Sequence, residues 1–158
     1  MDSMDLERSL DPTPSVEFAM VADAVQAVGG KLYILGGGWE LLYVESFPAR
    51  HPSIGIGMRL RVPWPYQDSF RLSVDLMDED GRSLLGNSRF SRTIRVRPPA
   101  RSMPGVEIGM TRAFTFNNLV FPEPGGYAFP IYVGDEEVSR IRFRVLERVR
   151  RAPRSGGG

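Results

Sequence analysis

Apolar and polar side chains alternate residue by residue along most of this chain, and that period limits the folds open to it. A two-residue period places every second side chain on the same face of an extended strand. In the segment 54–62, five apolar residues at even positions are opposed by two glycines and two arginines. The segments 70–76 and 141–145 repeat the pattern. We therefore predict that these segments are strands with one buried and one exposed face.

Turn-forming residues separate further segments of the same kind. Asp80-Gly81 and Gly134-Asp135 predict hairpins. Pro130 lies inside a predicted strand and indicates an edge strand or a bulge. Helical periodicity is almost absent, and its best candidate, Val21 to Val28, is followed at once by two glycines. The further strands are predicted at 16–21, 32–35, 39–44, 90–96, 114–116 and 127–133.

One-sided alternation is typical of antiparallel sheets that have one buried and one solvated face. Two such sheets stacked face to face bury both apolar sides. We therefore predict an all-β, two-sheet antiparallel sandwich of the immunoglobulin-like type with eight or nine strands. A closed barrel would use the same pattern and stays open as an alternative. We expect a disordered leader over 1–14, one domain over 15–147 and a disordered, basic, glycine-rich tail over 148–158.

Composition narrows the classes of function. The 158 residues are 42% hydrophobic and contain no cysteine, which excludes disulfides, zinc–thiolate sites and cysteine nucleophiles. The formal net charge of +1 makes nucleic acid or anionic lipid an unlikely main partner. No apolar stretch approaches the roughly 18 residues that cross a bilayer. Because the acidic N-terminus also lacks the apolar region of a signal peptide, we expect a cytoplasmic protein with no membrane anchor.

Arginines form one candidate binding surface. Arg140, Arg142 and Arg144 alternate with apolar residues, so they share the outer face of the last predicted strand; we call them the arginine face. Arg59 and Arg61 share the outer face of another strand. If the two strands were neighbours, a stripe able to bind phosphate or an acidic surface would result. The alternative is a solvated face that nearby carboxylates neutralise. The abundance of arginine would then reflect only the arginine codons of a GC-rich genome.

Two aromatic residues in a loop form a second candidate. Trp64 lies between two prolines in the sequence Pro63-Trp64-Pro65-Tyr66, and these prolines hold the backbone extended. Held in this way, Trp64 and Tyr66 could stack on a sugar or a base, or anchor a protein partner. The alternative is that Trp64 folds back and seals one end of the sandwich. Trp39 starts an apolar strand and is expected in the core.

No motif predicts catalysis or metal binding. His51 is the only histidine, lies in an expected loop, and no Gly-x-Ser-x-Gly sequence accompanies it. The sequence Asp78-Glu79-Asp80-Gly81 superficially resembles a calcium loop, yet the position that should supply a bidentate glutamate is Arg89. We expect a polar hairpin tip there. The alternative is a looser calcium site that gathers aspartates from separate loops, with Asp75 and Asp135 as contributors. We predict no catalytic residue, no metal and no cofactor.

The run Gly36-Gly37-Gly38 follows an apolar segment, so a phosphate-binding loop has to be considered. A dinucleotide-binding fingerprint needs a third glycine three residues after the second, at the start of a helix. Leu41 occupies that place, and a strand is expected to follow. The run therefore predicts a bulge or a sharp bend, where glycine accommodates unusual backbone angles.

Five blocks of the sequence are similar to those of a known family. They are 22–25, 30–39, Arg61-Val62-Pro63-Trp64, 78–82 and Pro124-Gly125-Gly126-Tyr127. Together they resemble a family of uncharacterised β-sandwich domains from high-GC actinobacteria, and the similarity spans roughly residues 16–146. That family has no assigned activity, so the resemblance implies a fold and transfers no functional residue.

Our leading hypothesis is a non-enzymatic binding or protein-interaction module. Its contacts would come from Trp64 and Tyr66 or from the arginine face, and its partner would be another protein. A first alternative is a hydrolase with dispersed carboxylates, for example Asp75 and Asp78, because two carboxylates within about 10 Å can hydrolyse glycosides. A second alternative is a structural subunit that assembles through strand edges, so an oligomer is possible.

Overall fold

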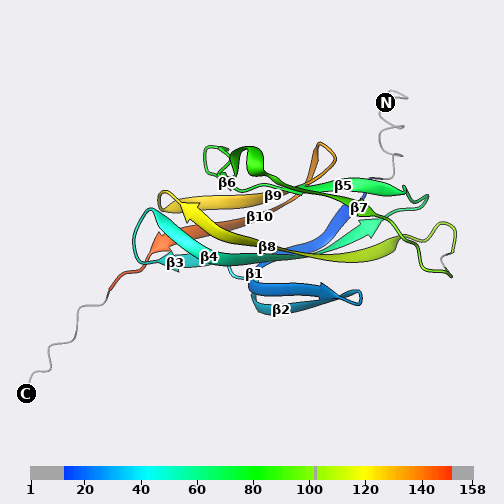
Figure 1. The fold of residues 1–158 in the computed structure, drawn as a ribbon, viewed down its shortest axis with the longest axis horizontal. Coiled ribbons are helices and arrows are strands. Elements are labelled where there is room, and N and C mark those ends of the chain that lie inside the picture. Colours follow the sequence, from blue (N-terminus) through cyan, green and yellow to red (C-terminus); the bar gives the residue numbers. More distant parts are fainter. Residues whose placement is uncertain (1–12, 102, 151–158) are drawn as a thin grey trace, which may run out of the picture.

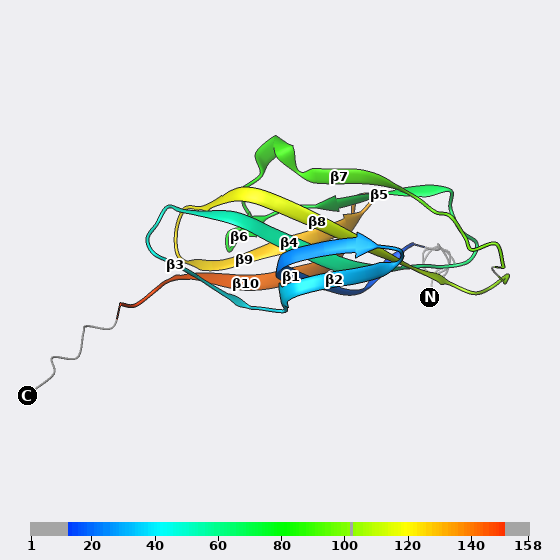
Figure 2. The same ribbon diagram turned by 60° about the horizontal axis from the view of Figure 1, so that its bottom comes forward.

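The computed structural model describes residues 13–101 and 103–150, and its regular structure is almost entirely β-strand (Figures 1 and 2). Ten strands in this part of the chain form a four-stranded sheet, in the order β2-β1-β4-β8, and a six-stranded sheet. The latter has the order β3-β10-β9-β5-β7, and β6 also pairs with β9. A 3₁₀ turn covers Gly86–Ser88. The strands are β1 Ser15–Val28, β2 Lys31–Gly37, β3 Leu41–Val44, β4 Ala49–Val62, β5 Ser69–Val74, β6 Met77–Asp78, β7 Phe90–Arg95, β8 Ile108–Phe121, β9 Gly125–Val133 and β10 Glu136–Glu147.

Both sheets contribute side chains to one apolar core. Ile56 of β4 and Leu72 of β5 are 0% exposed, and Phe143 of β10 is 3% exposed. The ring of Phe129 stacks on Phe143 at 5.3 Å and on Phe116 at 5.5 Å between ring centroids, which links β9 and β10 of one sheet to β8 of the other. Every-other-residue burial is therefore confirmed, and with it the all-β prediction. Trp39 is half-buried and packs edge-on against Phe143, as expected of a residue at the core.

The strand count and the strand directions differ from the prediction. Ten strands replace the predicted eight or nine, because Met77–Asp78 forms a two-residue strand, β6, too short to show a period. The prediction of wholly antiparallel sheets is wrong, because β3 pairs with β10 in parallel. The chain reaches β3 by leaving the four-stranded sheet at the glycine bend. Gly36 and Gly38 adopt φ angles of 61° and 80° there, so the predicted bend is confirmed.

Several strands are longer than their periodicity indicates, and three of them change the interpretation of the sequence. The helical candidate Val21 to Val28 is the second half of β1, because Gly29 and Gly30 both have positive φ and close a two-residue hairpin. Strand β4 begins at Ala49, so His51 lies in a strand that pairs with β8 and not in a loop. Strand β8 covers 14 residues where only 114–116 was predicted, since the core-side position 112 is an arginine that interrupts the apolar series.

Pro130 lies in an interior strand, so the edge-strand interpretation is wrong. Strand β9 has β10 on one side and β5 and β6 on the other. On the side of β5 and β6, β5 ends at Val74 and β6 begins at Met77, so the pairing with β9 is interrupted beside Pro130. On the opposite side of β9, the register of its pairing with β10 shifts between Glu137 and Ser139. The Pro130 carbonyl accepts from the Asp75 amide at 3.1 Å, so the missing amide donor also faces the interrupted side between β5 and β6.

The far part of the β1–β2 hairpin curls over the outer face of β4. A side chain at Gly55 would lie 2.6 Å from a methyl carbon of Val25, and one at Gly57 would lie 3.0 Å from the same valine. Ile34 also approaches the space above Gly57. The two glycines that appear as the polar side of β4 in the sequence are therefore buried under a second apolar layer.

Several predictions concern residues outside this structure. Residues 1–12 of the expected leader and 151–158 of the expected tail lie beyond the described part of the chain, so their disorder stays a prediction. At the start of the expected tail, the Arg148 amide donates to the Val44 carbonyl at 2.8 Å, and Arg148 pairs with Glu45 at 3.7 Å. Within residues 13–101 and 103–150, no helix has the length and apolar character needed to cross a bilayer.

The shared core predicts a large difference between two leucine truncations. Leu72→Ala should lower the free energy of unfolding by about 2–5 kcal/mol, because it removes buried methyl groups and leaves a cavity. Leu35→Ala is the matched control, since Leu35 is 72% exposed, and it should change stability by no more than about 0.5 kcal/mol. Urea unfolding followed by circular dichroism at low protein concentration measures both. Equal losses would contradict the assignment of the core.

Candidate functional site

The structure places the arginine face on the solvent side of β10. Phe143 and Val145 enter the core, so the alternating positions that carry Arg140, Arg142 and Arg144 are exposed. Their partners across β9 are, in the same order, Pro130, Ala128 and Gly126. Because these partners are small or compact, the surface of β9 is recessed beside the three arginine side chains.

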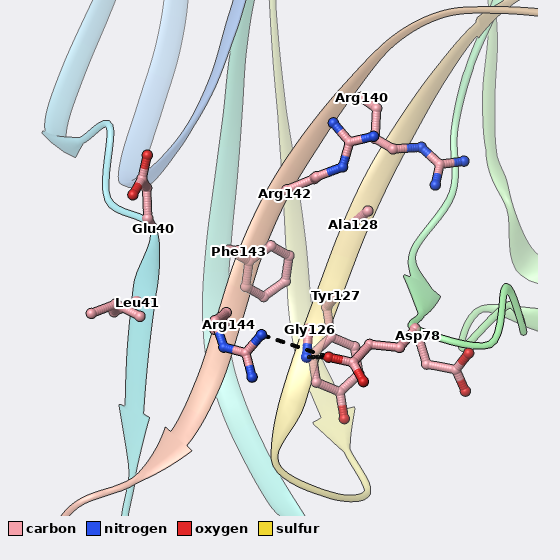
Figure 3. A pocket seen from close by; sticks show the side chains of 11 residues that line it. Glu40, Leu41, Asp78, Gly126, Tyr127, Ala128, Arg140, Arg142, Phe143 and Arg144 are labelled. Carbon is pink, nitrogen blue, oxygen red and sulfur yellow. Dashed lines mark hydrogen bonds and ion pairs between the residues drawn. The ribbon is translucent and has the colours of Figure 1, made fainter.

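An open hollow of about 540 Å³ lies over this part of the six-stranded sheet (Figure 3). Arg140 and Arg142 extend from β10 toward the side of β9, and Arg144 turns to the β6 hairpin. On the other side of β10, Glu40 and Leu41 form the wall nearest β3. The hollow therefore brings together β3, β10, β9 and the tip that follows β6. Its remaining lining residues are Asp78, Glu79, Gly126, Tyr127, Ala128 and Phe143.

The three arginines differ in their ionic partners. Arg140 Nε donates to Glu137 Oε1 at 2.6 Å, and this hydrogen bond raises the pKa of the Arg140 guanidinium above its ordinary value. Arg144 Nη1 lies 3.7 Å from Glu79 Oε1. Arg142 forms no ion pair with any residue of the described segments. The middle guanidinium is thus the one of the three that has no carboxylate partner among the described residues.

Glu79 holds the hairpin tip against the start of β9. Its Oε1 accepts a hydrogen bond from the Gly126 amide at 2.6 Å. A side-chain carbon at position 126 would lie 2.7 Å from the same oxygen, so a larger residue there would require the carboxylate to shift. The Gly126 amide and Arg144 together form a small anion-binding cradle, and Glu79 fills it.

The neighbouring polar groups of the hollow are also hydrogen-bonded. Asp78 Oδ1 accepts from the amides of Asp80 and Arg82, both at 2.9 Å, which makes the predicted polar hairpin tip. Tyr127 donates its hydroxyl proton to the Glu123 carbonyl. Burial raises the pKa of the Tyr127 phenol, and nearby carboxylates add to the shift. Tyr127 therefore stays a neutral donor at physiological pH.

The arginine stripe across two strands does not form. Arg59 and Arg61 lie in β4 of the four-stranded sheet, whereas the arginine face belongs to the other sheet. Glu17 joins Arg59 at 2.8 Å and Arg61 at 3.0 Å, so both of these arginines are already paired with one carboxylate. The prediction required β4 and β10 to be neighbours, and strand order cannot be read from alternation within single strands.

The two aromatic residues of the loop 63–68 lie outside the hollow. Trp64 is 45% exposed and packs edge-on against Tyr66 with 5.2 Å between ring centroids. Tyr66 packs against the core and donates its hydroxyl proton to the Val106 carbonyl, which ties the loop to the segment before β8. Only Tyr66 packs against the core, so the sealing of the sandwich end expected of Trp64 is not seen, and a binding role for Trp64 and Tyr66 stays a prediction.

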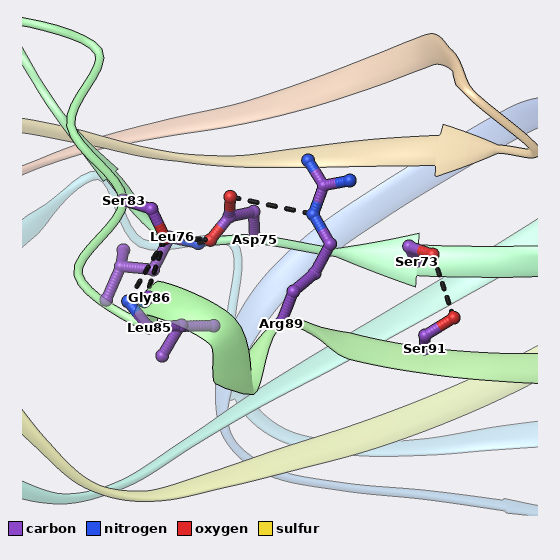
Figure 4. Close-up of polar contacts among 8 residues, drawn as sticks. All are labelled: Ser73, Asp75, Leu76, Ser83, Leu85, Gly86, Arg89 and Ser91. Carbon is purple, nitrogen blue, oxygen red and sulfur yellow. Dashed lines mark hydrogen bonds and ion pairs between the residues drawn. The ribbon is translucent and has the colours of Figure 1, made fainter.

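Asp75, one of the two carboxylates suggested for a hydrolase, is the centre of a structural network (Figure 4). It is 4% exposed, and its Oδ1 accepts from the Leu76 amide at 2.8 Å and the Ser83 hydroxyl at 2.7 Å. Its Oδ2 lies 3.6 Å from Arg89 Nε. Asp75 does not line the hollow that contains Asp78. Among the residues that the structure describes, no cluster of three or more histidine or acidic side chains could hold a metal ion.

The sequence indicated the arginine face but missed Glu79 and Gly126 as parts of the same site. Glu79 precedes Gly126 by 47 residues, and their meeting depends on the pairing of the two-residue strand β6 with β9. Two residues show no period, so no local pattern predicted that pairing. The only signal in the sequence was the pair of glycines at 125–126, which we noted only as part of a block shared with the resembling family.

Comparison with solved structures finds several distant similarities. An alkylpurine DNA glycosylase from Pseudomonas fluorescens, bound to DNA with an abasic site analogue, is 13% identical with a TM-score of 0.40, and the match covers 85% of this chain and 30% of that one. A β-glucosidase from Listeria innocua in complex with isofagomine is 12% identical with a TM-score of 0.45, over 82% of this chain and 16% of that one. The chain thus spans less than a third of either enzyme.

An immunoglobulin-like protein from Pseudomonas aeruginosa is 12% identical with a TM-score of 0.40, over 87% of this chain and 99% of that one. No curated protein matches the sequence. A family profile does match it, over residues 17–146, which is most of the described structure. The chain therefore belongs to a family of unknown function, DUF6941.

Proposed function

We propose that this protein is a non-enzymatic binding module that uses the hollow at the arginine face to contact another protein. The observation that carries the proposal is Arg142, an exposed guanidinium without an ion pair in the described chain. It lies between Arg140 and Arg144, which already form ion pairs with Glu137 and Glu79. A guanidinium offers a planar fork of donors that suits a carboxylate. Such a group, beside a low and partly apolar surface, is suited to recognition.

The fold supports this proposal as a scaffold. We propose an immunoglobulin-like sandwich in which the two sheets stack around the shared core and hold β10 rigid. A site on a strand keeps its side chains in more constant positions than a site on a loop. We also propose that the module acts in the cytoplasm of an actinobacterium. A hydrolase is less well supported, since Asp75 is committed to hydrogen bonds inside the protein.

Affinity capture with quantitative mass spectrometry tests the proposal. Arg142→Glu reverses the charge of the free guanidinium and should reduce recovery of the specific partner at least about tenfold, because the new carboxylate would face a carboxylate of the partner, and like charges at a contact cost on the order of 1–3 kcal/mol. Trp64→Ala should leave recovery unchanged.

Arg95→Glu is the matched control. It makes the same charge change at an exposed arginine in β7 of the same sheet, outside the hollow. The partner should be recovered with this control as with the wild type. Full recovery with Arg142→Glu, or equal loss with both arginine variants, would overturn the choice of surface.

Assembly through a strand edge is a second candidate, and exposed residues of β2 favour it. Strand β2 ends the four-stranded sheet, and its Tyr33 and Leu35 are 58% and 72% exposed. In an antiparallel pair of two copies centred on Ile34, each Tyr33 would face Leu35 of the other copy. The edge strands β7 and β8 instead carry Arg92 and Arg112 at core-side positions, which discourages edge pairing.

Size-exclusion chromatography with light scattering tests this second candidate. If β2 mediates assembly, the wild type should form a dimer at micromolar concentration. Leu35→Lys should return it to a monomer, because it places a charge against Tyr33 of the other copy at the paired edge. Leu41→Lys is the control at another exposed leucine on an edge strand. A wild-type monomer at all concentrations would rule out assembly through β2 and would leave the proposal for the hollow at the arginine face unchanged.

A further inference from the structure

The spacing of the arginine face matches that of an extended peptide. Successive outward residues of a strand lie about 6.8 Å apart, and the same distance separates alternate side chains of any extended segment laid along it. Arg140, Arg142 and Arg144 are therefore spaced like carboxylates on alternate residues of a ligand. Cross-strand partners beside them in β9 are small, which leaves room for such a segment over the strand.

Glu79 shows how this surface binds a carboxylate. Its Oε1 accepts a hydrogen bond from the Gly126 amide at 2.6 Å and lies 3.7 Å from Arg144 Nη1. One carboxylate oxygen thus contacts a main-chain donor and a guanidinium. At the other end, Glu137 is bound to Arg140 at 2.6 Å. Carboxylates of the protein itself thus occupy both ends of the row, and the middle position at Arg142 has none in the described segments.

We propose that the hollow takes an extended acidic segment of the partner protein, with carboxylates on alternate residues, and that Glu79 occupies the place of one ligand carboxylate. This inference rests on the proposed function and adds the class of ligand and an internal competitor. The ligand's central carboxylate pairs with Arg142. A second carboxylate competes with Glu79 for Arg144 and the Gly126 amide, so Glu79 sets the affinity.

The charges around the hollow favour an acidic peptide over a nucleic acid. Three acidic residues, Glu40, Asp78 and Glu79, line the hollow together with the three arginines. A nucleic acid backbone carries a charge at every nucleotide and is bound through released counterions, which needs a surplus of cations. A short alternating peptide carries few charges, and its carboxylates need only the guanidinium groups of the arginine face.

Fluorescence anisotropy with two synthetic peptides tests the inference. The probe is fluorescein-labelled Glu-Ser-Glu-Ser-Glu-Ser-Glu, and the comparison peptide, Ser-Glu-Glu-Glu-Glu-Ser-Ser, has the same composition with contiguous charges. The wild type should bind the alternating peptide more tightly. Arg142→Gln should weaken that binding about tenfold, the loss expected for one charge-assisted contact.

The decisive variant is Glu79→Gln, with Asp80→Asn as its matched control in the same turn. Each removes one negative charge, but only Glu79 contacts Arg144 and the Gly126 amide. Glu79→Gln should tighten binding roughly two- to fivefold, the range expected when an exposed ion pair stops competing. Asp80→Asn should stay within about 1.5-fold of the wild type, because its charge is exposed and screened. Circular dichroism and thermal unfolding of each variant verify the fold.

Three results would overturn the inference. Equal tightening by Glu79→Gln and Asp80→Asn would show an effect of net charge alone. Equal affinity for the two peptides would remove the role of spacing, and displacement by inorganic phosphate at the peptide's own concentration would show a simple anion site. If these results accompany loss of the captured partner in Arg142→Glu, the binding surface stands and only the ligand class is wrong.

Discussion

The shared apolar core fixes the face on which every other residue of each strand lies. A one-residue slip in register would send the buried side chains of a strand to water and its polar residues inward. In β10 this constraint is direct, because Phe143 packs against Phe129, Phe121 and Trp39 in the core. Its neighbours Arg142 and Arg144 must then point to solvent. The candidate binding surface is thus a consequence of how the core packs.

The order of the strands decides what surrounds those arginines. Strand β9 lies beside β10 and brings Ala128 and Gly126 next to Arg142 and Arg144. The two-residue strand β6 pairs with the start of β9 and delivers Glu79 to the same place. Without that short strand the hollow would lose one wall and its internal carboxylate. A minor element of secondary structure therefore gives the site its shape and its charge pattern.

Local periodicity predicted the strands and the outward direction of the arginines, because both depend only on neighbouring residues. It missed the strand at Val21 to Val28, which a local glycine hairpin pairs with β2. It also failed where partners distant in the sequence decide the outcome. Pro130 is interior because β10 lies on one side of β9, and β5 and β6 lie on the other. Arg59 and Arg61 contact Glu17 in β1, and the cradle of Glu79 depends on β6. Each of these follows from strand order, which alternation does not encode.

The claim that the outer face of β10 is the binding surface is tested most directly by nuclear magnetic resonance. The ¹⁵N-labelled protein would be titrated with the alternating glutamate peptide while backbone amide and arginine Nε–H signals are followed. We expect the changes to concentrate at residues 126–128 and 140–144. Changes centred on the Trp64 indole or on β2, with the β10 signals unmoved, would contradict the account.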